Sequence, residues 1–226
     1  MQHFDIVRNL EVPRTFRVSR IMADFDVSPE KANEHFVGDV CFPKKWNIGL
    51  IVGNSGTGKT TIANELFGNE INLSNRPFGN SPIIDEMPKE STVDDIERMF
   101  YAVGFGSVPS WFKPYAVLSN GEKMRVELAR ELLGNQLTVF DEFTSTVDRD
   151  VAKTCCIAVQ KAVRKNNKQF VAVTCHKDVE QYLQPDWVFD TDEMKTFFGD
   201  AHDRKCNLRL KNVGETNGDC LANIII

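Results

Sequence analysis

The sequence GNSGTGKT at residues 53–60 constrains the fold more than any other part of the chain. It matches G-x-x-x-x-G-K-[ST], the glycine-rich loop whose backbone N–H groups surround the phosphates of a nucleotide. The apolar run at residues 49–52 predicts a buried strand before the loop, and the apolar stripe over residues 60–67 predicts a helix that Gly68 ends. Strand, loop and helix in this order predict a nucleotide site, whereas the alternative is an ordinary glycine-rich turn.

The residue types in this loop suit phosphate and metal binding. Glycine at positions 53, 56 and 58 lets the backbone approach the phosphates, because a side chain there would block the N–H donors. Lys59 can reach the β- and γ-phosphates, and the Thr60 hydroxyl can bind Mg²⁺. We therefore expect ATP and Mg²⁺ as cofactors, and nucleotide contacts from Gly53, Asn54, Ser55, Gly56, Thr57, Gly58, Lys59, Thr60 and Thr61.

A second motif, LTVFDE at residues 137–142, places two carboxylates directly after a predicted buried strand. Ligands of open α/β sheets bind at the carboxyl ends of the strands. We expect Asp141 to hold Mg²⁺ directly or through water, and Glu142 to act as the general base toward the attacking water. The alternative is that both acids begin a helix, where its dipole favours negative charge.

A third motif, LSNGEKMR at residues 118–125, lies just before a predicted helix over residues 121–133. Ser119, Asn120 and Gly121 combine a hydroxyl, accessible backbone N–H groups and a positive helix end, which together make an anion-binding surface. The alternative is a capping box between Ser119 and Glu122. Taken alone, the local pattern favours the capping box.

The remaining chain alternates predicted strands with predicted helices. Strands are expected at 137–140 and 169–174, and helices at 151–163 and after the capping residues Ser91 and Thr92, with Val93, Ile96, Phe100 and Val103 on the apolar side. This alternation predicts a mainly parallel sheet covered by helices on both faces. Residues 16–28 and 39–42 are expected to be earlier strands, and residues 195–200 and 207–213 are candidate strands in the tail.

The order of these motifs resembles that of the ABC-type ATPases, over about residues 15–190. LSNGE resembles their LSGGQ signature, STVD at 145–148 resembles the D-loop, and VTCH at 173–176 resembles the strand end that carries the switch histidine. Residues 39–60 resemble the approach to the phosphate loop of that family. The resemblance implies an α/β P-loop NTPase fold with a mainly parallel sheet flanked by helices, an N-terminal antiparallel β part and a reduced helical subdomain. We expect the ATPase domain to span residues 1–190, and residues 191–226 to form a C-terminal tail or the start of a further region.

The same resemblance implies a homodimer that forms on ATP binding. In this head-to-tail arrangement the signature of one subunit closes over the ATP held by the phosphate loop of the other. By motif match, Ser119 and Gly121 would contact the γ-phosphate across the interface, with Asn120 between them in the nucleotide-binding signature, and Asp148 would communicate across the interface. His176 would hold the γ-phosphate and the attacking water, although a histidine after a strand is by itself usually structural.

Two features depart from the transporter pattern of the family. No glutamine occurs between residues 60 and 135, so Asp85 or Glu86 stands where the Q-loop glutamine is expected. Asp85 could meet Mg²⁺ or its water, but a carboxylate cannot donate an amide hydrogen bond. The interval from residue 59 to residue 119 is also short for a helical subdomain. The aromatic residue that stacks on adenine is expected to be Phe25, with Phe36 as the alternative, although either could belong to the core.

Composition limits the partners and the compartment. A net charge of −5 gives no overall positive field for nucleic acid or anionic lipid. The sequence has no window of about 20 apolar residues and no signal-peptide core, so we expect a cytoplasmic protein without membrane insertion. Six cysteines without a C-x-x-C pair favour reduced thiols over a zinc site or disulfides.

The sequence as a whole predicts an enzyme that binds and hydrolyses Mg-ATP and uses the cycle in a cytosolic process such as DNA maintenance or mobile-element and phage-related defence. The alternative is the ATP-binding subunit of an ABC transporter, and a third option, a non-catalytic binding module, is disfavoured by Glu142. We expect a further protein partner. Nucleic acid is another candidate partner, through the basic segment at 161–168, although the pattern of that segment favours a solvated helix end.

Overall fold

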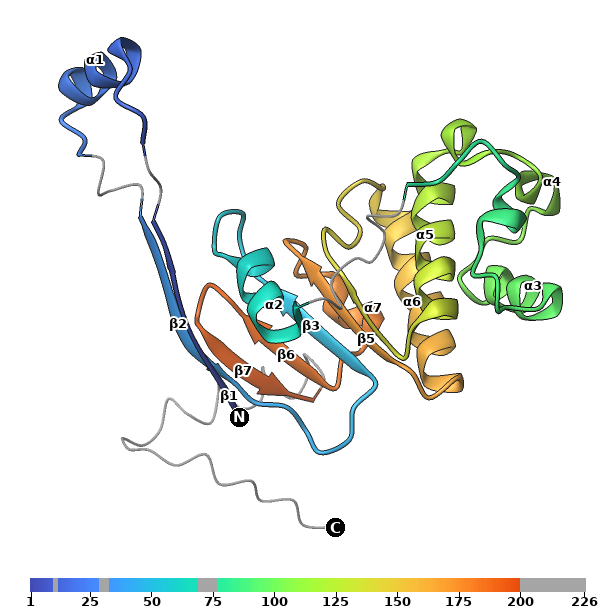
Figure 1. Ribbon diagram of the computed structural model, residues 1–226. Coiled ribbons are helices and arrows are strands. Elements are labelled where there is room, and N and C mark those ends of the chain that lie inside the picture. The colour runs from blue at the N-terminus through green and yellow to red at the C-terminus, as the bar shows by residue number, and fades with distance from the viewer. Residues whose placement is uncertain (10–11, 29–32, 69–76, 200–226) are drawn as a thin grey trace.

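The computed structural model describes residues 1–9, 12–28, 33–68 and 77–199. Its centre is a five-stranded sheet with the strand order β4-β5-β3-β6-β7 (Figure 1). Strands β4, β5, β3 and β6 run parallel, and β7 pairs antiparallel with β6. The strands are β3 (Ile48–Val52), β4 (Leu137–Phe140), β5 (Gln169–Thr174), β6 (Trp187–Asp190) and β7 (Lys195–Phe198).

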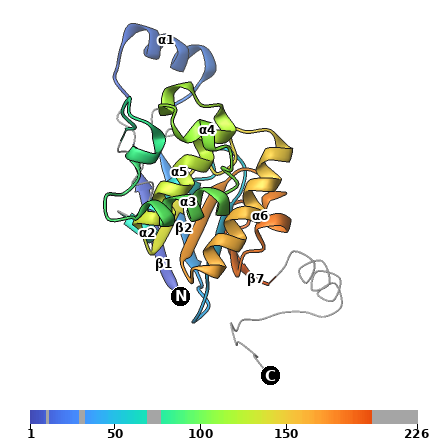
Figure 2. The same ribbon diagram turned by 90° about the vertical axis from the view of Figure 1, so that its right-hand side faces the viewer.

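Both faces of this sheet are covered, as the sequence predicts. All five residues of β3 are buried, which is typical of a strand in a parallel sheet with two covered faces. Leu50 and Val52 belong to the core formed with α5 (Asn120–Gly134) and α6 (Arg149–Lys165). Their neighbour Ile51 belongs to the core formed with α2 (Lys59–Phe67), because successive strand residues point to opposite faces. Figure 2 shows α5 and α6 in front of the sheet.

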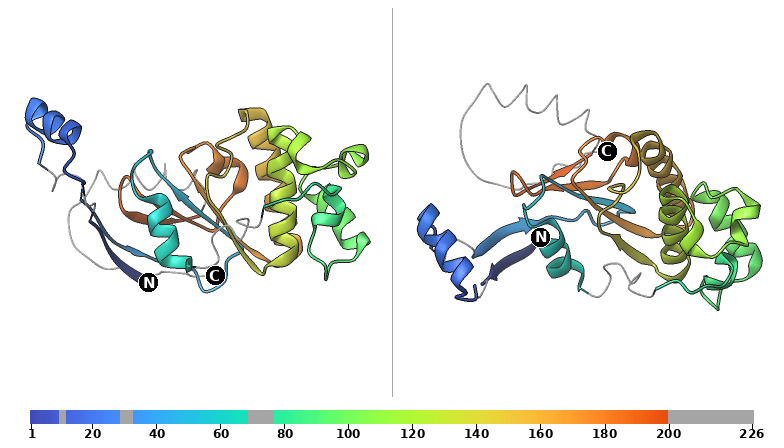
Figure 3. Two further views of the ribbon diagram at one scale, coloured as in Figure 1. Left: turned by 45° about the horizontal axis from the view of Figure 1, so that its top comes forward. Right: turned by 90° about the horizontal axis from the view of Figure 1, so that it is seen from above.

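A small helical region packs beyond α5. It contains α3 (Val93–Ala102), α4 (Val108–Trp111) and the short 3₁₀ helices η4 (Ile83–Glu86) and η5 (Tyr115–Val117) (Figures 1 and 3). Helix α3 starts after Thr92, which forms a capping box with Asp95. Of the residues predicted for its apolar side, Ile96, Phe100 and Val103 are buried, but Val93 is 64% exposed, so that part of the prediction is wrong.

The N-terminal part is antiparallel, as predicted, but it also contains a helix where a strand was expected. Strands β1 (Gln2–Arg8) and β2 (Glu34–Val40) form a two-stranded sheet next to α2. Residues 16–28 are mostly helix α1 (Phe16–Phe25), not strand. Thr15 caps this helix by accepting a hydrogen bond from the Val18 N–H, and its apolar residues follow a helical and not an alternating period. No residue of α1 is buried, and Figure 1 shows it beyond the far end of the two strands.

Most other predicted elements are confirmed to within two residues. They are α2 with Gly68 at its end, α5, β4, α6 and β5. The segment around Asp85, where the Q-loop glutamine is expected, forms η4, and the Pro82 carbonyl accepts from the Asp85 N–H at 2.9 Å. The sequence reasoning missed β6 and α7 (Val179–Leu183).

The sheet continues past residue 190, where the sequence analysis placed the end of the ATPase domain. The predicted tail strand at 195–200 is present as β7, which pairs with β6 from Asp190↔Lys195 to Trp187↔Phe198. We therefore propose that the domain includes β7. The candidate strand at 207–213 lies outside the described residues.

The described cysteines are free thiols, as expected. Cys155 and Cys156 are buried in α6, and burial raises the pKa of the Cys156 thiol to about 12. Cys175 is exposed. No helix within the described ranges has the length and apolar character needed to span a bilayer.

Candidate nucleotide-binding site

Three adjacent parallel strands bring three of the predicted motifs to one edge of the sheet. The phosphate loop follows β3, Asp141 and Glu142 follow β4, and His176 lies two residues after β5. Strand β5 lies between the other two, with Val52 opposite Thr174 and Phe140 opposite Ala172. The carboxyl ends of these strands therefore meet at the position where open α/β sheets bind ligands.

The phosphate loop requires glycine at several of its positions. Gly56 and Gly58 have φ values of +84° and +79°, in the left-handed region that favours glycine. A Cβ on Gly53 would lie 2.1 Å from the Thr191 Oγ1, and a Cβ on Gly58 would lie 2.6 Å from the Phe36 ring. The loop thus packs closely against the residues behind it, and an ordinary glycine-rich turn would not need this fit.

The start of α2 is suited to an anion. Its N-cap is Gly58, which has no side chain to satisfy the first N–H groups of the helix. The Lys59 Nζ lies across the loop and donates to the Asn54 carbonyl at 2.6 Å, and the Thr57 hydroxyl donates to the same carbonyl at 2.9 Å. Thr61 differs from the prediction in one respect, because its hydroxyl accepts from Arg8 of β1 at 3.1 Å.

Asp141 and Glu142 lie in a tight turn and do not begin a helix. Glu142 has a φ of +52°, and its N–H donates to the Asp141 Oδ1 at 2.9 Å. The Ser145 hydroxyl donates to the Glu142 Oε2 at 2.6 Å. Helix α6 begins only at Arg149, so the alternative interpretation of these acids as a helix start is wrong. A non-glycine residue at positive φ is uncommon, and such conformations concentrate at functional sites.

His176 contacts the turn that carries Glu142. Its Nδ1 lies 3.3 Å from the Oγ1 of Thr144, which is 1% exposed. The His176 N–H donates to the Thr174 Oγ1 at 3.1 Å. The imidazole is thus held by the same turn as the predicted general base.

The signature motif is a capping box in this structure, and it lies apart from the phosphate loop. The Ser119 Oγ accepts from the Glu122 N–H at 3.3 Å, and the Glu122 Oε2 accepts from the Ser119 N–H at 3.0 Å. The Ser119 backbone N–H is the main cause that lowers the pKa of Glu122. Ser119 and Asn120 are exposed, and Figures 1 and 3 show α5 separated from α2.

The signature motif and the D-loop of the same chain lie side by side in space. A Cβ on Gly121 would lie 3.2 Å from the Val151 Cγ1 of α6. Asp148 caps α6, and its Oδ1 accepts from the N–H groups of Asp150 and Val151 at 3.0 and 2.9 Å. These two motifs therefore form one surface.

The residue predicted to stack on adenine is not brought to the loop. Phe25 ends α1, is 70% exposed and lies away from the sheet (Figure 1). Phe36, the alternative, is 8% exposed and packs behind Gly58. Asp85 is exposed in η4. Across the described part of the chain, no three His, Cys, Asp or Glu side chains are grouped so that they could hold a metal ion.

Sequence reasoning missed the turn after β6, which supports the phosphate loop. The Asn54 N–H donates to the Asp192 Oδ1 at 2.9 Å, and the Thr57 and Thr191 hydroxyls lie 2.5 Å apart. Thr191 also donates from its N–H to the Val52 carbonyl at 2.8 Å. The short apolar run WVFD followed by TD was the available signal, because it places polar residues at another strand end.

The basic segment at 161–168 is partly used inside the protein. Arg164 donates to the Gln184 carbonyl at 2.7 Å and to Asp186 at 2.9 Å, and Lys168 donates to the Asn135 carbonyl at 2.9 Å. These contacts favour a structural helix end over a nucleic-acid contact.

Known proteins share this fold and, more distantly, this sequence. No family model matches the chain. The energy-coupling factor transporter ATP-binding protein EcfA1 of Staphylococcus aureus strain USA300 is 28% identical over 176 aligned residues, covering 61% of this chain and 64% of the relative. The chain thus spans less than two thirds of that protein's length.

Two solved structures have the same architecture. CbiO1 from Clostridium perfringens, described as part of the ABC transporter complex cbiONQ, has a TM-score of 0.57, 16% identity and coverage of 74% and 85% of the two chains. A dimeric post-hydrolysis state of the ATP-binding cassette MJ0796, bound to ADP and Pi, has a TM-score of 0.52, 14% identity and coverage of 70% and 87%. The fold is that of a P-loop NTPase of the ABC type. In fold, the chain is similar to these ATP-binding cassettes.

Proposed function

We propose that this chain binds Mg-ATP, hydrolyses it to ADP and phosphate, and forms a head-to-tail dimer around ATP. The observation that carries the proposal is that the phosphate loop, Asp141 with Glu142, and His176 all follow adjacent parallel strands at one edge of the sheet. A loop that binds phosphates, a carboxylate pair and a histidine are the groups that ATP hydrolysis needs together.

Each of these residues has a distinct role in the proposal. The N–H groups at the start of α2 and the Lys59 ammonium bind the phosphates. Thr60 and Asp141 would hold Mg²⁺, which supplies positive charge beside the phosphates. Glu142 removes a proton from the attacking water, and Ser145 fixes its carboxylate. His176, held by Thr144, orients the γ-phosphate and the water.

The dimer accounts for the position of the signature. Ser119, Asn120 and Gly121 are apart from the phosphate loop of their own chain, so they could meet ATP only across an interface. In this arrangement Asp148 lies beside the signature and communicates with the other site. The ADP-bound and Pi-bound dimer described for MJ0796 is consistent with such an assembly.

Among the candidate cellular processes, transport has the best support from the similar proteins. EcfA1 and CbiO1 are both named as parts of transporters. We therefore propose that the chain acts on the cytoplasmic side of a membrane with a separate membrane partner. Neither the structure nor the relatives named above support DNA maintenance or defence. The missing Q-loop glutamine distinguishes this chain from the transporter pattern, and Asp85 is the residue that stands in its place.

The direct test of nucleotide binding is to replace Lys59. Lys59→Ala should weaken ATP binding on the order of 10-fold or more, because it removes the charge that faces the phosphates. Isothermal titration calorimetry with Mg-ATP measures this change. Lys45→Ala is a matched control, because Lys45 is exposed and precedes β3, at the opposite end of the strand from the loop. Equal affinity in Lys59→Ala and Lys45→Ala would argue against the phosphate loop.

A further inference from the structure

Lys177 contacts two carboxylates on the turn that supports the phosphate loop. Its Nζ lies 3.1 Å from the Asp190 Oδ2 and 2.9 Å from the Asp192 Oδ2. Lys177 immediately follows His176 in the segment between β5 and α7, whereas Asp190 ends β6. The lysine therefore links the histidine segment to the turn after β6.

Asp192 in turn contacts the phosphate loop itself. Its Oδ1 accepts from the Asn54 N–H at 2.9 Å, and it would lie 3.2 Å from a Cβ on Gly53. Asp190 holds the same turn, because its Oδ1 accepts from the Asp192 N–H at 2.8 Å. The side chains of Asp190 and Asp192 are only 12% and 20% exposed, so water screens their charges incompletely.

The surroundings favour the charged forms of Asp192 and Lys177. The Asn54 N–H, followed by Lys177, lowers the pKa of Asp192, and the positive charge of Lys59 acts in the same direction. The hydrogen bonds to Asp192 and then to Asp190 raise the pKa of Lys177. Two negative charges thus lie beside a loop built to bind a triphosphate, and like charges in such a site repel each other.

We propose that Lys177 is a positioning residue for ATP binding: it neutralises Asp190 and Asp192, so that their turn supports the phosphate loop without repelling the triphosphate. This inference rests on the proposed function. With Lys177 the three side chains carry a net charge of −1, and without it they carry −2 (one lysine and two aspartates). Asp192 can therefore support the phosphate loop without weakening ATP binding only if Lys177 offsets its negative charge.

The test compares ATP affinities in the Glu142→Gln background, so that hydrolysis does not interfere. Lys177→Met should weaken Mg-ATP binding by about 5- to 10-fold at low salt, and the difference should shrink as salt screens the charges. Lys177→Arg should bind ATP as the parent does. In proteins with Glu142 intact, Lys177→Met should raise KM more than it lowers kcat.

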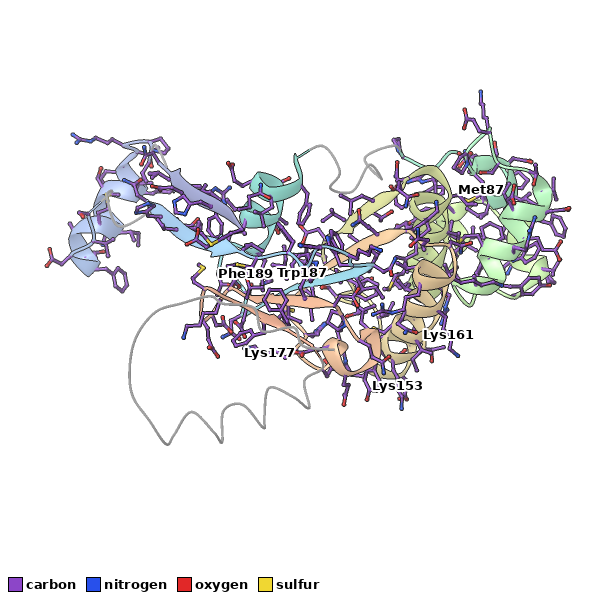
Figure 4. The ribbon with its side chains drawn as sticks, turned by 90° about the horizontal axis from the view of Figure 1, so that it is seen from below. Met87, Lys153, Lys161, Lys177, Trp187 and Phe189 are labelled. Carbon is purple, nitrogen blue, oxygen red and sulfur yellow. The ribbon has the colours of Figure 1, made fainter. Side chains whose placement is uncertain are left out.

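A second variant separates the effect of the Asp192 charge from the effect of its hydrogen bond with Asn54. Asp192→Asn keeps an oxygen for the Asn54 N–H but removes one negative charge, so Lys177→Met with Asp192→Asn should recover the parent affinity to within about 2-fold. Lys161→Met is the control for loss of a lysine, because Lys161 is exposed on α6 and apart from Lys177 (Figure 4).

The possible failures are distinguishable. If the parent binds ATP but Lys177→Met binds it equally well, the inference is wrong and the proposed function stands. If Asp192→Asn does not restore binding, or the defect is independent of salt, charge compensation is wrong. Absence of ATP binding in the wild-type chain as well as in Glu142→Gln would overturn the proposed function.

Discussion

Replacing Glu142 with glutamine is expected to lower the ATP turnover number about 10²-fold or more. The amide keeps the shape of the side chain and can still bond to Ser145, but it cannot accept a proton from water. Binding of Mg-ATP should therefore persist while hydrolysis slows, and ATP-bound protein should accumulate. Steady-state phosphate release measures the turnover, and calorimetry measures the binding.

Glu97→Gln is the matched control for this substitution. Glu97 is an exposed residue of α3, so losing its charge should leave turnover unchanged. Wild-type turnover in Glu142→Gln would show that Glu142 is not the base. Loss of ATP binding as well would mean that the substitution disturbs the turn rather than the chemistry.

Replacing Ser119 with arginine is expected to abolish ATP-dependent dimerisation while leaving ATP binding by the monomer near normal. In the proposed dimer the Ser119 side chain faces the γ-phosphate held by the other protomer, and an arginine there would be too large. The capping box predicts a different result, because loss of a cap costs about 1 kcal/mol of stability and does not change the oligomeric state. Sedimentation of Ser119→Arg in the Glu142→Gln background, with Mg-ATP, measures dimer formation.

Thr92→Arg provides the control for loss of a cap. Thr92 is an exposed N-cap residue with the same type of capping box, in this case at the start of α3. Both arginine variants should lose similar stability to urea, but only Ser119→Arg should lose the dimer. If Ser119→Arg dimerises as well as Thr92→Arg, the signature is only a helix start and the head-to-tail arrangement is incorrect.

The parts of the fold that were predicted correctly have strong local signals. The phosphate loop lies between a buried strand and a helix ended by Gly68, so motif and periodicity agree. Asp141 and Glu142 were predicted from their position after a strand, and His176 from the resemblance of VTCH to a family motif. The sheet order brings their strand ends together. Most of the candidate site could therefore be predicted from the positions of these residues in the sequence.

The parts that were missed depend on contacts distant in sequence or on a misread period. The segment 16–28 forms a helix because Thr15 caps it and its apolar residues are spaced for a helix, which a strand interpretation ignored. Asp192 supports the phosphate loop from 138 positions away. The run WVFD followed by TD indicates a strand end with polar residues after it, but it does not indicate which loop those residues contact. Phe25 was predicted as the aromatic residue upstream of the loop that stacks on adenine, but it ends α1, away from the sheet.

The mass of Glu142→Gln in solution, with and without Mg-ATP, tests the central claim that ATP joins two copies of this chain. The chain has a mass of 25.6 kDa, so light scattering should give that value without nucleotide and about twice that value with Mg-ATP. Lys59→Ala in the same background should remain at the lower mass. If calorimetry shows that Glu142→Gln has bound ATP and its mass still equals that of one chain, the ATP-joined dimer is contradicted.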